Sequence, residues 1–346
     1  MIVFGWRGFP QYAARCVGAF VKTCQEPVVV VAPKPLVPIR GMEEVCGCPV
    51  YWVDRVHDFT SQVSAFKPSE VTNYIVSGWG IPALDDLREQ VRRAGGRVTM
   101  MIDHRFKTDF KTLLENLRFR LVYRRKFDRF FVPGKSGRRL LRSWGVADRL
   151  IEEGMYAADA SLFRNTIPLA QRPKKIICVA QYIGWKNARR LILGFQKVNN
   201  PEWSLEFYGS GPLKGELTEL AKGSPNISIN DFLQPEQLCA KYNEARFFCL
   251  PSESENWGLV VHEAALSGCG LLLSKYVGSA ADLLVEGKNG LSFDPFDVES
   301  IALALKSAMA FTDAQLEAVE RMNAQMSNAA GLDKFVEAVS RLTAKT

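Results

Sequence analysis

Two carboxylates lie near each other in the stretch 251–268. Glu255 follows an apolar run in a predicted loop, and Glu263 comes eight positions later, inside a helix predicted to start around Gly258. The first turn of such a helix carries unpaired N–H groups and a partial positive charge, which make it a ready site for phosphate. Gly258 lets an anion approach the backbone because it has no Cβ. The stretch therefore predicts an anion site between two acids, one accepting hydrogen bonds from sugar hydroxyls and the other from ribose hydroxyls.

A parallel sheet has to position this stretch. After about residue 170, short apolar runs bounded by Gly, Pro, Asn or Asp alternate with helical patterns, which is typical of a doubly wound sheet. Such a sheet presents ligands at the carboxyl ends of its strands. The predicted strands are residues 175–180, 204–208, 227–229, 245–250, 270–273 and 290–293, and one helix is predicted over 187–198.

The first half of the chain repeats this pattern less cleanly. Strands are predicted over 2–5, 27–32, 74–77, 98–102 and 129–132, and helices over 12–24, 83–94 and 110–126. With 346 residues, the chain has the length of two domains. We therefore predict an α/β fold of two Rossmann-like, doubly wound domains, 1–168 and 169–346, that face each other across a ligand site. The last helix is expected to pack back on the first domain.

The positive charge is concentrated in one segment. The net charge is +7, but residues 1–165 carry +9 and residues 166–346 carry −2. Residues 105–149 alone hold 14 basic and 4 acidic residues. Apolar residues recur inside this segment, at 110, 113, 114, 117 and 121, with the spacing of one helical face. The segment is therefore predicted to be a folded helix with a basic face and not a disordered tail.

Three interpretations of the basic segment 105–149 remain open. It is a solvated surface, a surface for anionic lipid headgroups, or a surface for nucleic acid. Without a zinc-finger spacing or an RNP-like aromatic motif, we do not expect nucleic acid as a partner. The strongest apolar run, 28–39, is interrupted by Lys34 and three prolines and falls short of a membrane span, and we expect no signal peptide before it. We expect a cytoplasmic protein, peripheral on the inner membrane face if the lipid interpretation holds.

Further motifs surround the two acids in a fixed order. They are Gln181 before Lys186-Asn187, Tyr208-Gly209-Ser210-Gly211-Pro212, Phe232-Leu233, Pro251-Ser252, Ala264, Gly268, Gly278, and a tail from Gly287 through Gly290 and Phe293 to Asp297. Together with the Glu255-x7-Glu263 pair, this set resembles the signature of the retaining glycosyltransferases of family 4 (group 1), which have the GT-B fold. The resemblance covers about residues 129–310. The ordered set is specific, whereas the Glu pair alone would be weak.

The resemblance implies a role for each residue of the donor site. Glu255 would contact the transferred sugar, Glu263 the ribose, and Lys186 the diphosphate as its bond to the sugar breaks. Fixed donors aimed at a leaving diphosphate stabilise the transition state efficiently. The other implied donor-binding residues are Gln181, Gly209, Gly211, Phe232, Leu233, Ser252, Asn256, Trp257, Gly258, Leu259 and Val260, the last four offering backbone N–H groups to the diphosphate.

A metal or another cofactor is not expected. Members of the resembled family generally need no metal, and no Asp-x-Asp motif follows a predicted strand here. The Cys46-Gly47-Cys48 pair is too short for a zinc motif. The nucleotide sugar itself would be a substrate.

The acceptor side is expected in the first domain. The family's glycine-rich loop after its first strand corresponds here to Gly5-Trp6-Arg7-Gly8, in which Arg7 is expected to face an acceptor phosphate. Asp103 and His104, at the end of a predicted strand, stand where many family members carry a polar residue, so both are candidate catalytic residues. A surface histidine in a strand-end loop is an equally weighted interpretation of His104. Trp79 is a further acceptor-side candidate.

Gln181 departs from the family pattern. It stands where the family has an arginine, and a neutral amide cannot stabilise diphosphate charge as a guanidinium does. The main prediction is a retaining, metal-independent transfer of a sugar from a nucleotide diphosphate to a glycan or lipid-linked acceptor, in the synthesis of cell-envelope polysaccharide or glycolipid. The alternatives are a sugar-nucleotide epimerase of the GT-B fold, and a non-catalytic protein of this fold that binds nucleotide sugars, which Gln181 favours.

Overall fold

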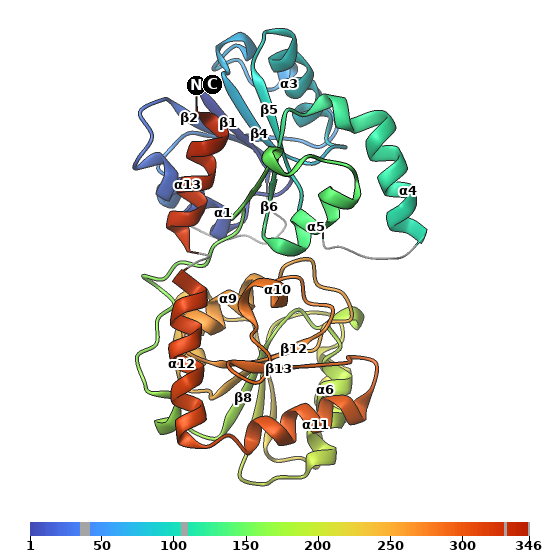
Figure 1. Ribbon diagram of the computed structural model, residues 1–346, viewed down its shortest axis with the longest axis vertical. Helices are drawn as coiled ribbons and strands as arrows, with labels where there is room; N and C mark the ends of the chain where they lie inside the picture. Colours follow the sequence, from blue (N-terminus) through green and yellow to red (C-terminus); the bar gives the residue numbers. More distant parts are fainter. Residues whose placement is uncertain (35–41, 105–109, 329–330, 345–346) are drawn as a thin grey trace. The chain divides into compact units, whose positions relative to one another are not determined.

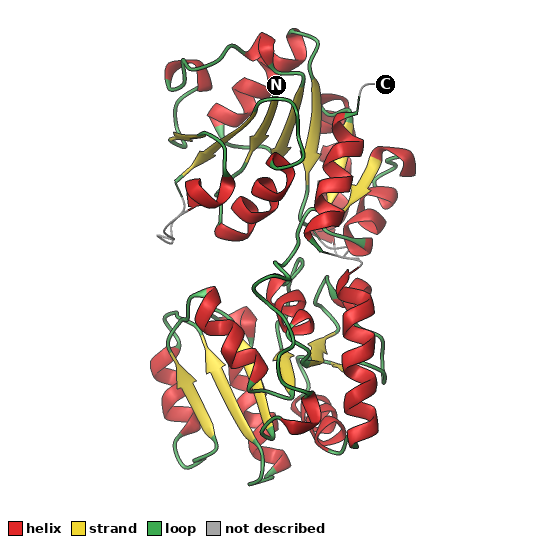
Figure 2. Cartoon of the chain, turned by 90° about the vertical axis from the view of Figure 1, so that its left-hand side faces the viewer, coloured by secondary structure: helices red, strands yellow, loops and turns green. Residues whose placement is uncertain are grey.

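The computed structural model describes residues 1–34, 42–104, 110–328 and 331–344 (Figure 1). The chain divides into two compact units. The first unit comprises Met1–Ala157 and the C-terminal segment with helix α13 (Leu332–Thr343), and the second unit begins at Ala158 and includes helix α12 (Asp313–Asn328). In each unit, helices cover both faces of a sheet (Figure 2). Two α/β units confirm the predicted fold class.

The first unit is built on a seven-stranded parallel sheet in the order β3-β2-β1-β4-β5-β6-β7. Its strands are β1 (Ile2–Gly5), β2 (Val28–Pro33), β3 (Val50–Val53), β4 (Asn73–Ser77), β5 (Arg97–Met101), β6 (Arg129–Val132) and β7 (Ile151–Glu153). The five predicted strands are confirmed. The sequence missed β3 and β7, the two edge strands, because neither is a continuous buried run: only Val53 and Ile151 are fully buried in them.

The helices of the first unit connect these strands. They are α1 (Gln11–Val21), α2 (Met42–Cys46), α3 (Pro82–Arg93), α4 (Phe110–Arg118), α5 (Lys135–Ser143) and α13, with the short turns η1 (Phe59–Ser61), η2 (Pro68–Glu70), η3 (Phe119–Tyr123), η4 (Arg124–Lys126) and η5 (Asp148–Leu150). The turn η3 is π-helical. The predicted helix over 110–126 is therefore present, as α4 followed by η3 and η4.

The second unit is built on a six-stranded parallel sheet in the order β10-β9-β8-β11-β12-β13. The strands are β8 (Lys175–Val179), β9 (Ser204–Tyr208), β10 (Ile227–Asn230), β11 (Phe247–Leu250), β12 (Gly270–Ser274) and β13 (Gly290–Phe293). The helices are α6 (Ala188–Val198), α7 (Lys214–Ala221), α8 (Pro235–Asn243), α9 (Leu259–Leu266), α10 (Ala280–Leu283), α11 (Val298–Met309) and α12, with the turns η6 (Leu169–Gln171) and η7 (Gly184–Lys186). All six predicted strands are confirmed.

The structure divides the chain earlier than the predicted boundary between residues 168 and 169. Residues from Ala158 onward are tied to the second unit by hydrogen bonds: the Ala158 N–H donates to His262 Nδ1 over 3.1 Å, and the Thr166 N–H donates to Asn243 Oδ1 over 2.8 Å. At the other end of the chain, the α13 residue Phe335 packs against Phe4 and Phe131. The C-terminal helix thus belongs to the first unit.

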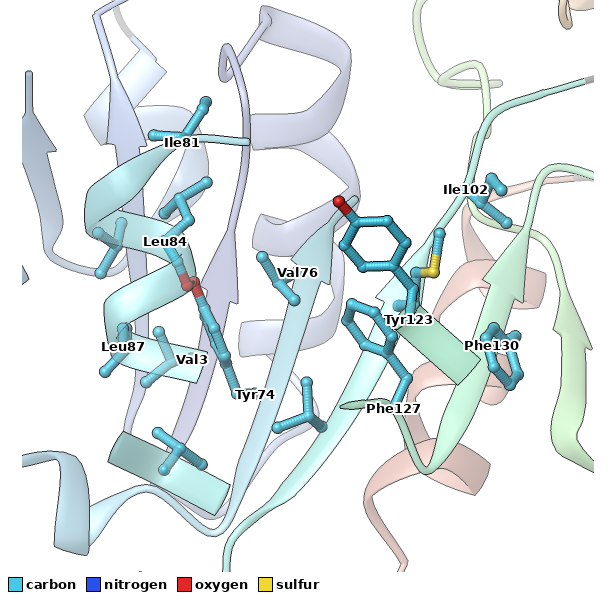
Figure 3. Close-up of a cluster of buried hydrophobic side chains, with 14 of the residues drawn as sticks. Val3, Tyr74, Val76, Ile81, Leu84, Leu87, Ile102, Tyr123, Phe127 and Phe130 are labelled. Carbon is cyan, nitrogen blue, oxygen red and sulfur yellow. Dashed lines mark hydrogen bonds between the residues drawn. The ribbon is translucent and has the colours of Figure 1, made fainter. Parts of the chain in front are cut away.

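A buried cluster of apolar side chains holds the first unit together. Figure 3 shows Tyr74 and Val76 on β4 in this cluster, with Tyr123 and Phe127 from the helical segment and the loop that follow α4. Tyr123 and Phe127 are 9% and 2% exposed. The residues after α4 are therefore anchored in the core, although this is the most basic part of the chain. Across the described helices, none combines the length and the apolar content that a membrane crossing requires.

Candidate functional site

Lys186 and Glu255 form an ion pair at one edge of the second sheet. Lys186 ends the turn η7 after β8, and Glu255 lies in the loop after β11, which is the neighbouring strand. Both side chains are largely buried, with 18% and 16% exposed. The hydroxyl of Ser252, a fully buried residue, lies 3.4 Å from the same carboxylate oxygen. Because parallel strands end at the same edge of a sheet, the fold brings together residues that are 69 positions apart.

Asn187 fixes the backbone beside Lys186. Its φ of 59° and ψ of 29° are left-handed, and its side-chain amide donates to the carbonyls of Pro251, over 3.1 Å, and Pro295, over 2.8 Å. Arg190 donates to Asn187 Oδ1 over 2.9 Å and to Glu253 Oε1 over 2.5 Å. The loop after β8 is thereby attached to the loop after β11. The sequence analysis did not predict this role of Asn187. An asparagine immediately before a predicted helix could have indicated it, because asparagine adopts left-handed backbone and bonds to nearby backbone groups.

The loop 251–258 is also held from its other side, by the loop after β12. The Glu255 N–H donates to the Tyr276 carbonyl over 3.1 Å, and the Gly278 N–H donates to the Glu255 carbonyl over 3.0 Å. A Cβ on Gly278 would lie 1.8 Å from the Asn256 carbonyl oxygen. Only glycine fits there, so Gly278 is required for the position of the loop that carries Glu255.

Helix α9 begins directly after this loop. Gly258, with φ 83°, precedes its first residue, Leu259, and Val260 follows. The residue before it, Trp257, is 4% exposed, and its indole Nε1 has no hydrogen-bond partner among the described residues. The same holds for the hydroxyl of Ser279, which is fully buried and whose N–H donates to the Trp257 carbonyl over 3.1 Å. An unpaired buried donor costs roughly 1–3 kcal/mol, so these two groups are a local cost of packing this loop against the start of α9.

Glu263 lies on α9, and burial of its carboxyl group raises the pKa to about 7. The residue keeps some exposed surface, but the carboxyl group itself is enclosed by protein. The Tyr242 hydroxyl donates to Glu263 Oε2 over 3.4 Å, which partly opposes the rise of the pKa. Its neighbour His262 is completely buried and accepts a hydrogen bond from Ala158, so it packs as a structural residue.

The loops after β8 and β9 pack backbone against backbone. A Cβ on Gly209 would lie 1.9 Å from the Ala180 carbonyl oxygen, and a Cβ on Gly211 would lie 2.5 Å from that of Tyr182. The Tyr182 N–H donates to the Ser210 carbonyl over 2.8 Å. The side chain of Gln181, between these contacts, is exposed. The two glycines therefore shape this edge of the sheet.

Phe232 and Leu233 follow β10 at the edge of the second sheet. Phe232 is 50% exposed and Leu233 is partly buried. The Tyr182 hydroxyl donates to the Asn230 carbonyl over 2.5 Å, which attaches the end of β10 to the loop after β8. Among the predicted donor residues, Phe232 thus offers an exposed aromatic ring, and Asn256 in the loop after β11 is half-buried.

In the first unit, Arg7 and Trp79 lie together at the ends of β1 and β4. The Arg7 N–H donates to Ser77 Oγ over 2.7 Å, and its guanidinium donates to the Trp79 carbonyl over 3.2 Å. A larger residue does not fit at Gly5, because a Cβ would lie 2.4 Å from the Tyr74 hydroxyl. A Cβ on Gly8, in contrast, would meet nothing within 4 Å. The predicted acceptor residues Gly5, Arg7, Gly8 and Trp79 are therefore close together, with the Arg7 side chain exposed.

Asp103 and His104 follow β5 and differ in their surroundings. The Tyr156 hydroxyl donates to Asp103 Oδ2 over 2.8 Å, and the Tyr156 ring meets the Tyr12 ring edge-on at 5.2 Å between centroids. Burial raises the pKa of both tyrosines, so they act as hydrogen-bond donors in their neutral form. His104 is exposed. The basic residue Arg105, where the predicted basic segment 105–149 begins, lies outside the described residues, as do 106–109.

Comparison with known proteins adds to this geometry. The family model described as "Glycosyl transferases group 1" matches residues 159–330, which include nearly all of the second unit and every predicted donor residue discussed above. Through these residues the chain belongs to the glycosyl transferases group 1. Within the matched residues, Asn187 follows Lys186 with a left-handed backbone, which asparagine adopts more readily than most other non-glycine residues.

The curated relatives match only part of this chain. A sulfoquinovosyl transferase of Arabidopsis thaliana is 37% identical over 112 residues, which cover 32% of this chain and 22% of the relative. A GDP-mannose-dependent α-(1-6)-phosphatidylinositol monomannoside mannosyltransferase of Mycolicibacterium smegmatis is 24% identical over 158 residues, covering 42% and 41%. The chain thus matches less than half of the length of these relatives.

A solved structure extends the likeness to both units. HepE of Anabaena, in complex with UDP and glucose, superposes with a TM-score of 0.77 over 98% of both chains, at 13% identity. At this identity the likeness establishes the fold, and the predicted GT-B architecture is confirmed. The family and the fold agree with the resemblance seen in the sequence.

Proposed function

We propose that this protein is a retaining glycosyltransferase that transfers a sugar from a nucleotide diphosphate to a glycan or a lipid-linked acceptor. The observation that carries the proposal is the Lys186–Glu255 ion pair, located beside the N-terminal end of α9. A cation, an acid and the first turn of a helix, on adjacent loops, suit a ligand with an anionic half and a hydroxyl-rich half. A sugar diphosphate is such a ligand.

The chemistry assigned to each group follows from its charge. In the transfer, the bond between the sugar's anomeric carbon and the diphosphate oxygen breaks, the acceptor oxygen bonds to that carbon, and the acceptor's proton leaves on the departing diphosphate. The leaving diphosphate gains negative charge, which Lys186 and the N–H groups of residues 257–260 are placed to stabilise. Glu255 accepts hydrogen bonds from the sugar hydroxyls.

Glu263 is assigned to the ribose of the donor. A carboxylate with a pKa of about 7 is partly protonated near neutral pH, and the hydroxyls of a ribose donate best to its ionised form. The exposed ring of Phe232 and the side chain of Leu233, beyond β10, provide an apolar contact for the base.

Lys186 has to act without the arginine that the family has at position 181. Arg189 and Arg190 are the nearest arginines in sequence, and each is paired with a carboxylate: Arg189 with Glu216 over 2.8 Å and Arg190 with Glu253 over 2.5 Å. We therefore assign the stabilisation of the leaving diphosphate to Lys186, with backbone donors, and not to a substitute guanidinium.

The acceptor is assigned to the first unit. Arg7, which is exposed, offers a cation for an acceptor phosphate, and Trp79, Asp103 and His104 are the other acceptor-side residues. The name of the mycobacterial relative describes transfer to a phosphatidylinositol mannoside, which supports a lipid-linked acceptor here. HepE was solved with UDP and glucose, which supports a UDP-sugar as the donor.

Binding and turnover with a panel of UDP-, GDP- and ADP-sugars test the proposal. The preferred donor should raise the melting temperature by mass action, and transfer to an acceptor should release the nucleoside diphosphate. The variant Glu255→Gln should bind donor but lose most turnover. Glu202→Gln is the control, because Glu202 forms an exposed ion pair with Lys174, over 2.6 Å, at the opposite end of β8.

A nucleotide-sugar-binding protein without turnover is the second candidate function. The exposed neutral amide of Gln181, where the family has a guanidinium, is the observation that favours it. Donor binding by the wild-type protein, with no release of nucleoside diphosphate in the presence of any acceptor or of water, would replace the first proposal with this one. Isomerisation of the donor sugar without acceptor would indicate an epimerase instead.

A further inference from the structure

The helical segment after β5 has one face that is fixed in the core of the first unit. Phe119, Tyr123 and Phe127 are buried on this face, and Figure 3 shows the last two beside Phe130 of β6. The Tyr123 ring stacks on the Trp79 ring, with 4.0 Å between centroids and 12° between planes. The segment is therefore held firmly from its inner side.

The outer face of the same segment exposes apolar side chains. Leu114, Leu117, Leu121 and Val122 are 52%, 55%, 75% and 48% exposed. Their spacing of i, i+3, i+7 and i+8 is that of one helical face. Ten large apolar side chains are exposed in the described part of the chain, and four of them lie within these nine residues. Single exposed leucines are ordinary, but a contiguous apolar strip on a helix marks an interaction surface.

Arginines surround this apolar strip. Arg118, Arg120 and Arg125 are exposed, and Arg124 is half-buried. The Arg118 guanidinium donates to the Tyr123 hydroxyl over 3.1 Å, and Arg120 donates to the carbonyls of Ser143 and Trp144. Between residues 114 and 126 there are five basic side chains and one acidic side chain, Glu115. The strip is thus apolar in the middle and strongly cationic around it.

We propose that the outer face of residues 114–125, the basic apolar face, docks on an anionic lipid bilayer. The four apolar side chains enter the boundary between headgroups and acyl chains, and the arginines meet the headgroup phosphates. The charge argues for this partner. Two copies of the same cationic face would repel each other, and nucleic acid would match the arginines but leave the leucines without a contact. A bilayer with anionic headgroups satisfies both kinds of side chain.

This inference goes beyond the proposed function, because every residue of the basic apolar face belongs to the first unit and none is a donor residue. It adds the location at which the enzyme works: with this face on a bilayer, the protein meets acceptors that are dissolved in the membrane. Docking of this kind needs no spanning helix, because a membrane-surface helix is anchored by its apolar strip and its charges.

Cosedimentation with vesicles tests the inference. Wild-type protein is mixed with vesicles of phosphatidylcholine, or of phosphatidylcholine and phosphatidylglycerol in equal parts, at low and high salt. We expect strong binding to the anionic vesicles, weakened by salt. Leu117→Ser/Leu121→Ser should reduce the partition coefficient by about 100-fold, from the transfer of two leucine side chains. Arg125→Glu should reduce the partition coefficient by about 25-fold. The substitution changes the charge by two units, and each unit contributes about five-fold.

Matched variants on the second unit provide the control. Leu303 is 67% exposed on α11, and Lys306 is exposed on the same helix, so Leu303→Ser and Lys306→Glu repeat the changes elsewhere. Both should bind vesicles like wild type, and all variants should keep the wild-type melting temperature and donor-induced shift. Equal binding to both kinds of vesicle, or wild-type binding by the double leucine variant, overturns the inference. So does a wild-type dimer that the double leucine variant converts to a monomer, because the face would then join two copies.

Discussion

The ammonium group of Lys186 lies against the carboxylate of Glu255, at the ends of the neighbouring strands β8 and β11. Both side chains are more than four-fifths buried, so the desolvation of the two charges offsets much of their attraction. The pair is therefore better explained by a role in function than by a gain in stability. A donor diphosphate between the lysine and the helix α9 would give the ammonium a second anionic partner. Removing either charge of the pair should therefore lower turnover much more than it lowers the stability of the fold.

Glu255→Gln should reduce turnover by about 100-fold or more while leaving the fold intact. The amide keeps the shape of the side chain and can still accept from Lys186, but it loses the charge that the transition state uses. Lys186→Ala should reduce turnover by a similar factor, with kcat affected more than KM. Steady-state kinetics with the preferred donor measure both effects.

Urea unfolding of the same variants separates the two roles. Glu255→Gln should lower the free energy of unfolding by about 1–3 kcal/mol, because the hydrogen bond is retained but the largely buried Lys186 ammonium loses its countercharge. A variant that keeps wild-type turnover would show that the residue is not part of the catalytic site. A variant that loses turnover only in proportion to its loss of folded protein would make the ion pair purely structural.

Asn187→Ala should destabilise the protein by about 2–4 kcal/mol. Alanine in a left-handed conformation costs about 1–2 kcal/mol, and the two hydrogen bonds from the Asn187 amide to Pro251 and Pro295 are lost as well. Asn187→Gly avoids the first cost and should lose only about half as much. Unfolding in urea measures both variants.

Asn199 offers the control for this comparison, because it has a φ of 48° at the other end of α6 and is exposed. Asn199→Gly should change the stability by a few tenths of a kcal/mol. If Asn187→Gly were as harmless as Asn199→Gly, the hydrogen bonds of Asn187 would contribute nothing to the position of the β11 loop.

The sequence predicted the central strands because they are buried on both faces. Phe247–Leu250 of β11 is an uninterrupted apolar run, and all four residues are buried. The edge strand β7 was missed, since Ile151–Glu153 is only three residues long and ends in two charged glutamates. The rule that ligands bind at the carboxyl ends of parallel strands, together with the family resemblance, then sufficed to assign Lys186 and Glu255 to one predicted donor site.

Contacts between distant side chains were beyond prediction from the sequence. Nothing in the spacing of Tyr242 and Glu263 shows that a hydroxyl on α8 reaches a carboxylate on α9, or that burial raises the pKa of that carboxylate to about 7. The bond from Tyr156 to Asp103 joins residues 53 positions apart. Such pairs depend on how helices pack on the sheet, which periodicity does not encode.

The buried carboxyl of Glu263 should make stability depend on pH. Its pKa of about 7 lies above the ordinary value of 4.5, so the unfolded chain ionises this group more readily than the folded protein does. Its contribution to stability is therefore complete below pH 4.5 and is lost as the pH rises through 7. Between pH 5 and pH 8, Glu263→Gln, which cannot ionise, should gain about 2–3 kcal/mol of unfolding free energy relative to wild type. The same difference in unfolding free energy between Glu263→Gln and wild type at pH 5 and at pH 8 would contradict this assignment.

Donor affinity should depend on the ionisation of the same carboxyl group, but it should rise with pH where stability falls. Ribose hydroxyls donate to the ionised carboxylate, so bound donor favours the charged form and lowers the pKa of Glu263. The affinity for a UDP-sugar should rise with pH between 6 and 8 and then level off, and Glu263→Gln should remove this dependence. Calorimetric titrations in that range measure it. A wild-type affinity that does not change with pH would separate Glu263 from the ribose.

Gly278→Ala should impair the donor site through the backbone alone. The added Cβ would lie 1.8 Å from the Asn256 carbonyl oxygen, so the loop that carries Glu255 has to move. Because a displacement of about 1 Å can cost about 100-fold in rate, turnover should fall by that order while the sheet stays folded. Gly215→Ala is the control, since a Cβ there meets nothing within 4 Å, and it should keep wild-type turnover. The crystal structure and kinetics of both variants test this directly: an unmoved loop with reduced turnover, or a moved loop with full turnover, would break the link between Gly278 and the chemistry of Glu255.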